Sequence, residues 1–315
     1  MNSFFGRLLA PFRNTTGLAR WILVTGLIIT GTFVIAAIFA PILAPYGFAQ
    51  MSVAGVDFPK TSPPGPGHLF GTNNQFYDIL SRVIWGAQTA ISVVLLSVVL
   101  SALIGVPLGL LSGYVGRWTD RILVFIMDAL YAFPSLLLAI VFAFLLQHSI
   151  GSGVISAALS LTVIYIPQYF RVVRNTTVSA REATYVEAAR ALGAKNGTIM
   201  GRYLFSNVIQ SVPVIATLNA ADAISTLAAL GFLGLGIQPT DASEWGYDLS
   251  RALQDASAGI WWTGFFPGMA IVGLVMGLTL VGEGLNETIN PTLRKRRFRK
   301  VTLPPRTPGR EEVGS

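Results

Sequence analysis

The sequence has little charge for its length and contains no cysteine. Asp, Glu, Lys and Arg make up only 12% of the 315 residues, whereas 52% are hydrophobic. Soluble domains carry roughly 25% charged residues, so this balance places much of the chain in a lipid bilayer. The absence of cysteine excludes disulfides, thiolate metal sites and cysteine nucleophiles.

Histidines and phosphate-binding motifs are also scarce. The two histidines, His68 and His148, are isolated, which argues against a histidine-based metal site. There is no G-x-x-x-x-G-K-[ST] loop, so no ATP site is expected in this chain. With no His-Glu-x-x-His motif and no paired acids at helical spacing within an apolar run, the sequence predicts no catalytic, metal or cofactor-binding residue.

Apolar runs long enough to cross a bilayer recur along the chain, since a spanning helix needs about 20 residues. The first run is longer than the ~7–15-residue core of a cleaved signal peptide, so we interpret it as a retained span. Residues 44–86 are rich in Pro and Gly and cannot form one helix. The six predicted spans lie at about residues 21–43, 87–114, 122–146, 155–170, 207–235 and 260–281.

The placement of positive charge orients these spans. If the N-terminus is cytoplasmic, all but three of the 22 Lys and Arg residues fall in cytoplasmic segments; the exceptions are Lys60, Arg82 and Arg251. Cytoplasmic loops carry an excess of Lys and Arg, so both termini are predicted to be cytoplasmic. The same pattern accounts for the net charge of +7, and no nucleic-acid partner is needed.

A short polar segment between the fourth and fifth runs has the spacing of an amphipathic helix. One narrow face, at positions i, i+3, i+4 and i+7, consists of Tyr185, Ala188, Ala189 and Leu192. Gly193 follows this run, as expected of a residue that ends a helix in a left-handed turn. On spacing alone, a solvated loop helix capped by glycine explains the pattern equally well.

The same segment resembles a known motif. Glu187-Ala188-Ala189, three further residues and Gly193 resemble the EAA motif of ABC-importer permeases, in the version of the oligopeptide, dipeptide and nickel group. In that family the motif lies on a cytoplasmic coupling helix that docks into a groove of the ATPase subunit. The resemblance implies that movement of the ATPase reaches this chain through Tyr185, Glu187, Ala188, Ala189, Leu192 and Gly193.

Four further stretches resemble the same family, in its order along the chain. They are Gly71-Thr72 with Asp78-Ile-Leu-Ser-Arg82, Ala132-Phe-Pro-Ser-Leu-Leu-Leu-Ala139, Glu244-Trp245-Gly246, and Gly282-Glu-Gly-Leu-Asn-Glu-Thr-Ile-Asn-Pro291. The chain departs from the family pattern at Asn73 and Tyr77, and at Ser206, where the family has a proline. Over residues 21–295 the resemblance implies an all-α membrane protein with six transmembrane helices and a cytoplasmic coupling helix, the type I ABC importer permease fold.

The resemblance also implies an organisation and a set of partners. The expected layout is a cytoplasmic N-terminus (1–20), a first helix and outer segment (21–86), a five-helix core (87–291) with its coupling loop (175–202), and a basic cytoplasmic tail (292–315). The chain would lie in a bacterial inner membrane, among lipids, as one permease of an ATP-driven importer of di- or oligopeptides. Its implied partners are a second homologous permease, one or two P-loop ATPases that bind ATP and Mg²⁺, and an extracytoplasmic substrate-binding protein.

Acids inside the predicted spans are candidate pathway residues, because a charge at the bilayer centre costs at least ~2.5 kcal/mol. Asp128 lies in the third run and Asp222 in the fifth, and Glu283 lies near the cytoplasmic end of the sixth. Asp222 and Asn219 can line a polar cavity that contacts substrate. The alternative is structural: each acid packs against an interfacial Arg or against the partner permease.

Two other classes of protein stay open from the sequence. An ion-coupled secondary transporter would use Asp128 or Asp222 as its cation or proton site, although the two halves show no internal repeat. An intramembrane enzyme would need a catalytic cluster, which the sequence lacks.

The acidic segment 237–258 is expected to face outward, either as a solvated loop or as a docking site for a substrate-binding protein.

Overall fold

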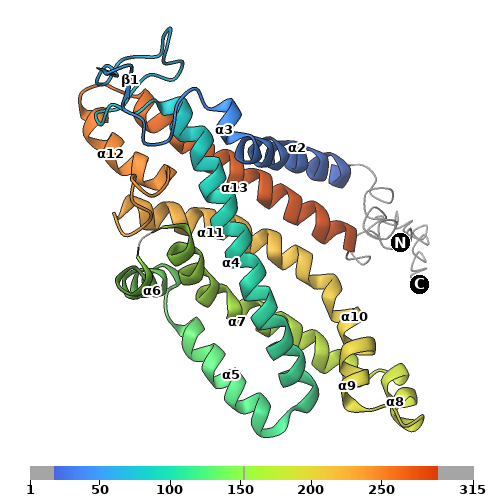
Figure 1. Cartoon of the computed structure of the whole chain (residues 1–315). Helices are drawn as coiled ribbons and strands as arrows, with labels where there is room; N and C mark the ends of the chain where they lie inside the picture. The colour runs from blue at the N-terminus through green and yellow to red at the C-terminus, as the bar shows by residue number, and fades with distance from the viewer. Residues whose placement is uncertain (1–17, 152, 290–315) are drawn as a thin grey trace, which may run out of the picture.

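The computed structural model describes residues 18–151 and 153–289 (Figure 1). Its first elements are α2 (Leu18–Ile38), α3 (Ala40–Leu43), β1 (Ser52–Val53), β2 (Val56–Asp57), α4 (Ile79–Val115), α5 (Arg117–Ala132), α6 (Ser135–Ile150) and α7 (Val154–Arg181). There follow α8 (Thr184–Ala191), α9 (Asn196–Thr198), the π-helical turn η1 (Ile199–Leu204), α10 (Phe205–Val208), the 3₁₀ turn η2 (Ile209–Ser211), α11 (Val212–Phe232), α12 (Trp245–Ser257) and α13 (Trp262–Ile289). The predicted tail at 292–315 and residues 1–17 lie outside the described residues.

Each predicted span corresponds to helix in the structure. Helices α2, α4 and α13, and the helical stretch Asn196–Phe232 that contains α11, are each long and apolar enough to cross a membrane. Helices α5 and α6 pass this criterion together, as a bent pair. Helix α7, which contains the fourth predicted span, does not meet this criterion by itself, and it continues past residue 170 as a polar segment that reaches Arg181.

The third predicted span, 122–146, is wrong as a single straight helix. Helices α5 and α6 meet at an angle of 95°. Pro134 lacks a backbone N–H, and the residue before a proline is driven towards extended conformations; Phe133 accordingly has φ −80° and ψ 140°. The break therefore follows from the Phe133-Pro134 pair inside the run.

The helix that contains the second predicted span begins before residue 87. Helix α4 begins at Ile79, because Asp78 caps its first turn. The Asp78 carboxylate accepts hydrogen bonds from the backbone N–H of Ser81 at 2.8 Å and from the Ser81 hydroxyl at 2.7 Å. The non-helical segment before α4 therefore ends at Asp78, earlier than its Pro and Gly content suggested.

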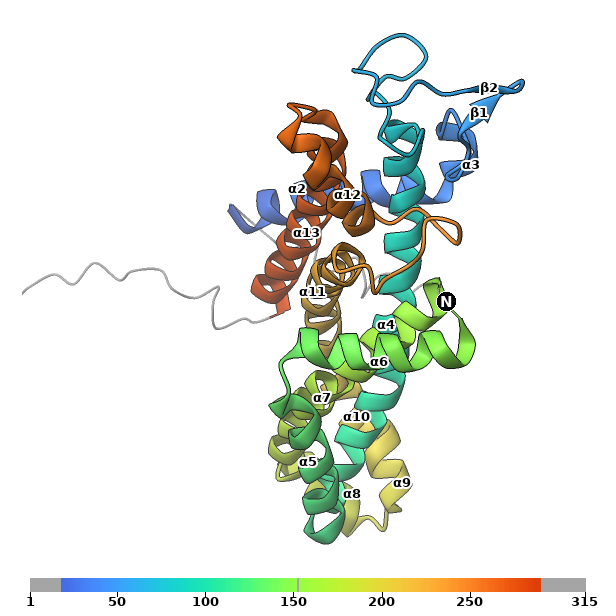
Figure 2. The ribbon, with the colours of Figure 1, turned by 90° about the vertical axis from the view of Figure 1, so that its left-hand side faces the viewer.

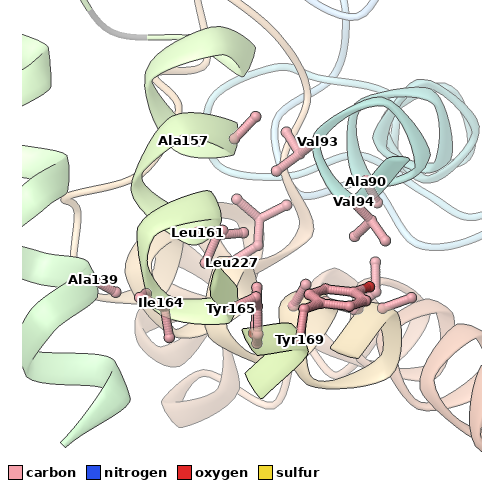
Figure 3. Packing of buried hydrophobic residues seen from close by; sticks show 14 of the residues in the cluster. Ala90, Val93, Val94, Ala139, Ala157, Leu161, Ile164, Tyr165, Tyr169 and Leu227 are labelled. Carbon is pink, nitrogen blue, oxygen red and sulfur yellow. The ribbon is translucent and has the colours of Figure 1, made fainter. Parts of the chain in front are cut away.

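The core of the molecule is the contact between α4 and α7. Gly105, Gly109 and Gly113 recur every fourth residue on the face of α4 that meets α7, and a Cβ on any of them would lie within 3 Å of α7 atoms. Small residues at this spacing let two membrane helices approach closely. Figure 3 shows side chains of α4 and α7, such as Val93 and Leu161, packed together with Leu227 of α11.

The two ends of the elongated molecule carry different elements. Figures 1 and 2 show the hairpin β1–β2, α3 and α12 at one end of the long helix α4, and α8 and α9 at the opposite end. The β1–β2 hairpin is antiparallel, with Ser52 opposite Asp57. Helix α8, which carries the candidate coupling segment, and the end with β1–β2 and α12 are therefore connected mainly through α4 and the helices packed on it.

Candidate functional site

Helix α8 ends as its sequence predicts. Gly193 has a φ of +82°, the left-handed conformation that favours glycine. Its N–H donates to the Arg190 carbonyl at 2.9 Å, and the Ala194 N–H donates to the Ala189 carbonyl at 3.0 Å. These two hydrogen bonds form a Schellman motif, so the predicted role of Gly193 in ending this helix is confirmed.

The predicted single apolar face of α8 is divided between two environments. Ala189 is 4% exposed and, with Val186, lies buried beneath the helix, which packs against η1. Tyr185, Ala188 and Leu192 are exposed, Leu192 by 89%. The prediction that Ala188 and Ala189 share one docking face is corrected, because Val186 and Ala189, three positions apart, form the inward stripe.

Polar contacts anchor α8 to the transmembrane helices. The Tyr185 hydroxyl accepts a hydrogen bond from Asn207 Nδ2 of α10 at 3.1 Å. The Arg190 guanidinium lies 5.7 Å from the ring centroid of Tyr114, near the end of α4. Arg181, just before α8, donates to the Gly113 carbonyl of α4 at 3.0 Å. Displacement of α8 would therefore be felt directly by α4 and α10.

The exit from this loop is helical. At Ser206 the chain lacks the proline of the family pattern, and the helical stretch from Asn196 runs on to Phe232 through η1, α10 and η2. The Ser206 hydroxyl donates to the Arg202 carbonyl at 2.8 Å, as serine does inside a helix. The departure at Ser206 thus gives an uninterrupted connection from the loop into α11.

A cavity of about 480 Å³ opens at the break between α5 and α6. Its wall is formed by the end of α5, the start of α6, the middle of α7 and α11. Its polar lining residues include Ser135, Gln168, Asn219 and Asp222. The structure thus brings the predicted pair Asn219 and Asp222 together on one wall of a cavity.

The two α11 residues differ in their surroundings. Asp222 is exposed, and its Oδ2 accepts a hydrogen bond from the Tyr165 hydroxyl at 2.8 Å. Asn219 is 3% exposed, and its Nδ2 has no hydrogen bond of acceptable geometry, although the Tyr169 hydroxyl lies near it. Tyr165 was missed from the sequence, because a tyrosine in an apolar run gives no signal of its partner.

The third pathway candidate, Asp128, does not line this cavity. Its carboxylate forms an ion pair with Arg171 at 2.7 Å, and the Arg171 guanidinium stacks over the Tyr131 ring at 3.9 Å from its centroid. A second pair, Asp120 with Arg174, also joins α5 to α7. Asp128 therefore has the structural partner foreseen as the alternative, while Glu283 is exposed near the end of α13.

At the end of the molecule that carries α12, residues of two separate sequence motifs meet in a buried contact. The Arg82 guanidinium pairs with the Asp248 carboxylate, with Nη2 2.8 Å from Oδ1 and Nε 3.1 Å from Oδ2, and their side chains are 1% and 5% exposed. The Trp245 indole donates to the Val83 carbonyl at 3.1 Å. It fits because Gly86 has no Cβ, which would lie 2.2 Å from Trp245 Nε1.

The interpretation of segment 237–258 as a solvated loop is therefore wrong. The segment contains α12, which packs on α11 and α13. Its acids Glu244, Asp248 and Asp255 are buried rather than solvated. A sequence signal was available, since Glu244 occupies the position before Trp245 where an acid caps a helix and accepts hydrogen bonds from its first N–H groups.

Glu244 titrates in an unusual range. Its carboxylate accepts the N–H groups of Gly246 at 2.8 Å and Tyr247 at 2.7 Å and packs on Gly231. Burial raises the pKa of Glu244 to about 8 from 4.5, against the lowering effect of those N–H groups, while the nearby Asp248 adds to the rise. The folded protein thus holds this proton at pH values where the unfolded chain has lost it.

We predict that Glu244 makes the protein less stable as pH rises from about 4.5 to about 8, since the unfolded state ionises first and the folded state later. Glu244→Gln removes this titration while keeping a carbonyl oxygen for the cap. Tryptophan fluorescence measures the melting temperature of the purified protein at pH 5.5 and at pH 8.5. Between these two pH values the melting temperature should fall less for the variant than for the wild type. Equal falls would show that Glu244 does not retain the proton.

Comparison with known proteins gives a consistent result. The profile of the family "Binding-protein-dependent transport system inner membrane component" matches residues 105–295. The dipeptide transport system permease protein DppC of Alkalihalophilus pseudofirmus is 36% identical over 271 residues, 86% of each chain. The glutathione transport system permease protein GsiD of Pectobacterium atrosepticum is 33% identical over 84% of this chain and 86% of its own.

A solved structure supports the fold. The inward-facing MetNI methionine ABC transporter superposes with a TM-score of 0.54, covering 66% of this chain and 96% of the matched chain at 21% sequence identity. At this identity the likeness concerns the fold alone. The chain therefore shares the fold of a chain of that transporter.

The fold and the matches to known families together define a class, the multi-pass permease subunits of ABC importers. The chain belongs to the binding-protein-dependent transport system inner membrane component family. It is thus a transport subunit that works within an ABC transporter complex, as the resemblance of residues 185–193 indicated. This membership does not favour the ion-coupled alternative.

Proposed function

We propose that this chain is one of two homologous permeases that form the pathway of an ATP-driven importer of di- or oligopeptides. Support for the substrate comes from relatives at 33–36% identity, which are named as dipeptide and glutathione permeases. A di/tripeptide permease of Pseudomonas aeruginosa is likewise 35% identical over 85% of this chain. Peptides are thus favoured over nickel and sugars, which other members of the group transport.

The observation that carries the proposal is α8, a capped helix with Ala188 and Leu192 exposed and with contacts to Tyr114 of α4 and to α10. We assign its exposed face to docking with one or two P-loop ATPases, which hold ATP and Mg²⁺. The positive-charge bias puts α8 and both termini in the cytoplasm. The extracytoplasmic substrate-binding protein would then dock at the end that carries α12.

The cavity at the α5–α6 break is the proposed part of the pathway in this chain. It lies where a helix break exposes polar residues among apolar helices, and non-helical backbone at membrane depth is tolerated where it lines a cavity. Asn219 and Asp222 provide its polar wall, whereas Asp128 is not a lining residue and pairs with Arg171. Rocking of the two permeases would open this space to either side.

Transport by the purified complex tests this function. The tagged chain is isolated from its native membrane with its partners, identified by mass spectrometry, and reconstituted in liposomes with the binding protein. We expect uptake of a labelled dipeptide that needs ATP on the ATPase side and stops when the phosphate-loop lysine of the ATPase is replaced. Uptake that ignores ATP and follows an imposed ion gradient would support a secondary transporter instead.

A further inference from the structure

We propose that Asp222 and Asn219 form a transit site for the free amino terminus of a peptide. The Asp222 carboxylate would accept the terminal ammonium group, and Asn219 Nδ2 would donate to the first peptide carbonyl. This inference rests on the proposed peptide transport and adds which chemical group of the substrate is recognised inside the membrane.

Asp222 is available to a cation. The Tyr165 hydroxyl occupies its Oδ2, and no described residue donates a hydrogen bond to its Oδ1. Asp120 and Asp128 are neutralised by Arg174 and Arg171, whereas no Lys or Arg pairs with Asp222 within residues 18–151 and 153–289. An acid in a span without a cationic partner is unfavourable, so an entering ammonium group would be attracted to it.

Asn219 supplies the complementary donor. Its side chain is almost fully buried, it lines the same cavity, and its Nδ2 makes no hydrogen bond, with the Tyr169 hydroxyl as its neighbour. A buried donor without a partner costs about 1–3 kcal/mol, which an incoming carbonyl oxygen would recover. Residues three apart on a helix lie on one face, about 5–6 Å between Cβ atoms, so both groups can reach one small ligand.

The pairing of groups distinguishes peptides from other cargo. A peptide amino terminus carries a cationic donor next to a carbonyl acceptor, which matches a carboxylate beside an amide N–H. Apolar lining residues, among them Phe133, Leu138 and Ile164, leave room for varied side chains. No group of three or more His, Asp or Glu residues suited to a metal ion occurs in the described chain, so a bare divalent cation fits this site poorly.

Asp222→Asn tests the site, because it keeps the shape and removes the charge. Uptake of alanyl-alanine by the reconstituted complex should fall about tenfold, the effect of losing one hydrogen bond to a charged group. Assembly, basal ATP hydrolysis and the affinity of the separate binding protein should not change. Asn219→Leu, which removes the side-chain amide and with it the donor, should lower uptake in the same direction.

Two control variants separate a local effect from a general one. Glu287→Gln removes an acid on α13, and Ser225→Ala changes α11 at a groove that faces α13. Both should transport alanyl-alanine at the wild-type rate. Equal losses in all four variants would overturn the proposed site.

A binding measurement identifies the group that is recognised. Complex in detergent, without the binding protein, is incubated with labelled alanyl-alanine and with propionyl-alanine, which lacks the amine. Wild type should retain the amine-bearing peptide preferentially, and Asp222→Asn should bind the two alike. A wild-type complex that transports peptide but shows no such preference contradicts this site alone, whereas a wild type that transports no peptide contradicts the proposed function.

Discussion

Replacement of Ala188 by Arg is expected to lower ATP-driven uptake by roughly tenfold to a hundredfold while the complex still assembles. Ala188 is exposed on α8, between the exposed side chains of Tyr185 and Leu192, so a long charged side chain there would hold the ATPase away from the helix. Overpacking an interface costs about 1–3 kcal/mol, which corresponds to a loss of roughly tenfold to a hundredfold in coupling. ATP hydrolysis should continue without stimulation by the loaded binding protein.

Two neighbouring substitutions serve as controls for this result. Ala188→Ser adds one small atom at the same place and should preserve uptake. Ala189→Arg places the same charge in the buried interior of the loop, so it should lower the melting temperature and the yield of the chain instead. Undiminished uptake by the Ala188→Arg complex would exclude docking on this face of α8.

Replacement of Arg82 by Met is expected to cause the largest loss of stability of any single change considered. Arg82 and Asp248 are both buried, and removal of one partner leaves an uncompensated charge at a cost of about 3–5 kcal/mol. The Arg82 guanidinium also donates to the Phe48 carbonyl at 3.2 Å, so the variant loses this contact between α4 and the loop before it as well. Thermal unfolding of the purified chain, followed by tryptophan fluorescence, measures the effect.

A double variant distinguishes loss of the pair from loss of the residue. Arg82→Met with Asp248→Leu removes both charges and should regain part of the melting temperature lost in the single variant. Glu182→Gln breaks the exposed contact with Arg181 and should cost less than about 1 kcal/mol. If Arg82→Met lowered the melting temperature no more than Glu182→Gln does, the buried Arg82–Asp248 pair would not stabilise the protein.

The parts of the fold that follow local rules could be predicted from the sequence. Apolar runs of sufficient length located a helix for each span, and Gly193 marked the end of α8. Two differences from the prediction also have local causes: α4 begins at Ile79 because Asp78 caps it, and α5 ends before Phe133 because a proline follows. Asp78 lies in a segment rich in turn residues and the proline in an apolar run, and these surroundings concealed both signals. Boundaries therefore moved where capping and proline geometry outweighed composition.

Long-range pairing could not be predicted. Arg82 and Asp248 are 166 positions apart, and Tyr165 and Asp222 are 57 apart, so no periodicity connects them. The burial of Ala189 depends on η1, whose π-helical turn the sequence did not indicate. For the candidate site, the sequence supplied Asn219 and Asp222 as residues of interest, and only the α5–α6 break explains why they face a cavity.

The most direct test of the central claim is site-specific cross-linking from α8. The chain has no cysteine, so Leu192→Cys, at a position 89% exposed, introduces a single reactive thiol for a photoactivatable maleimide. In native membranes, irradiation is predicted to join this position to a subunit that mass spectrometry identifies as a P-loop ATPase. Val56→Cys, 71% exposed at the opposite end, should not cross-link to that subunit. Cross-linking of Val56→Cys to the ATPase, or of neither variant while both thiols react, would contradict coupling through α8.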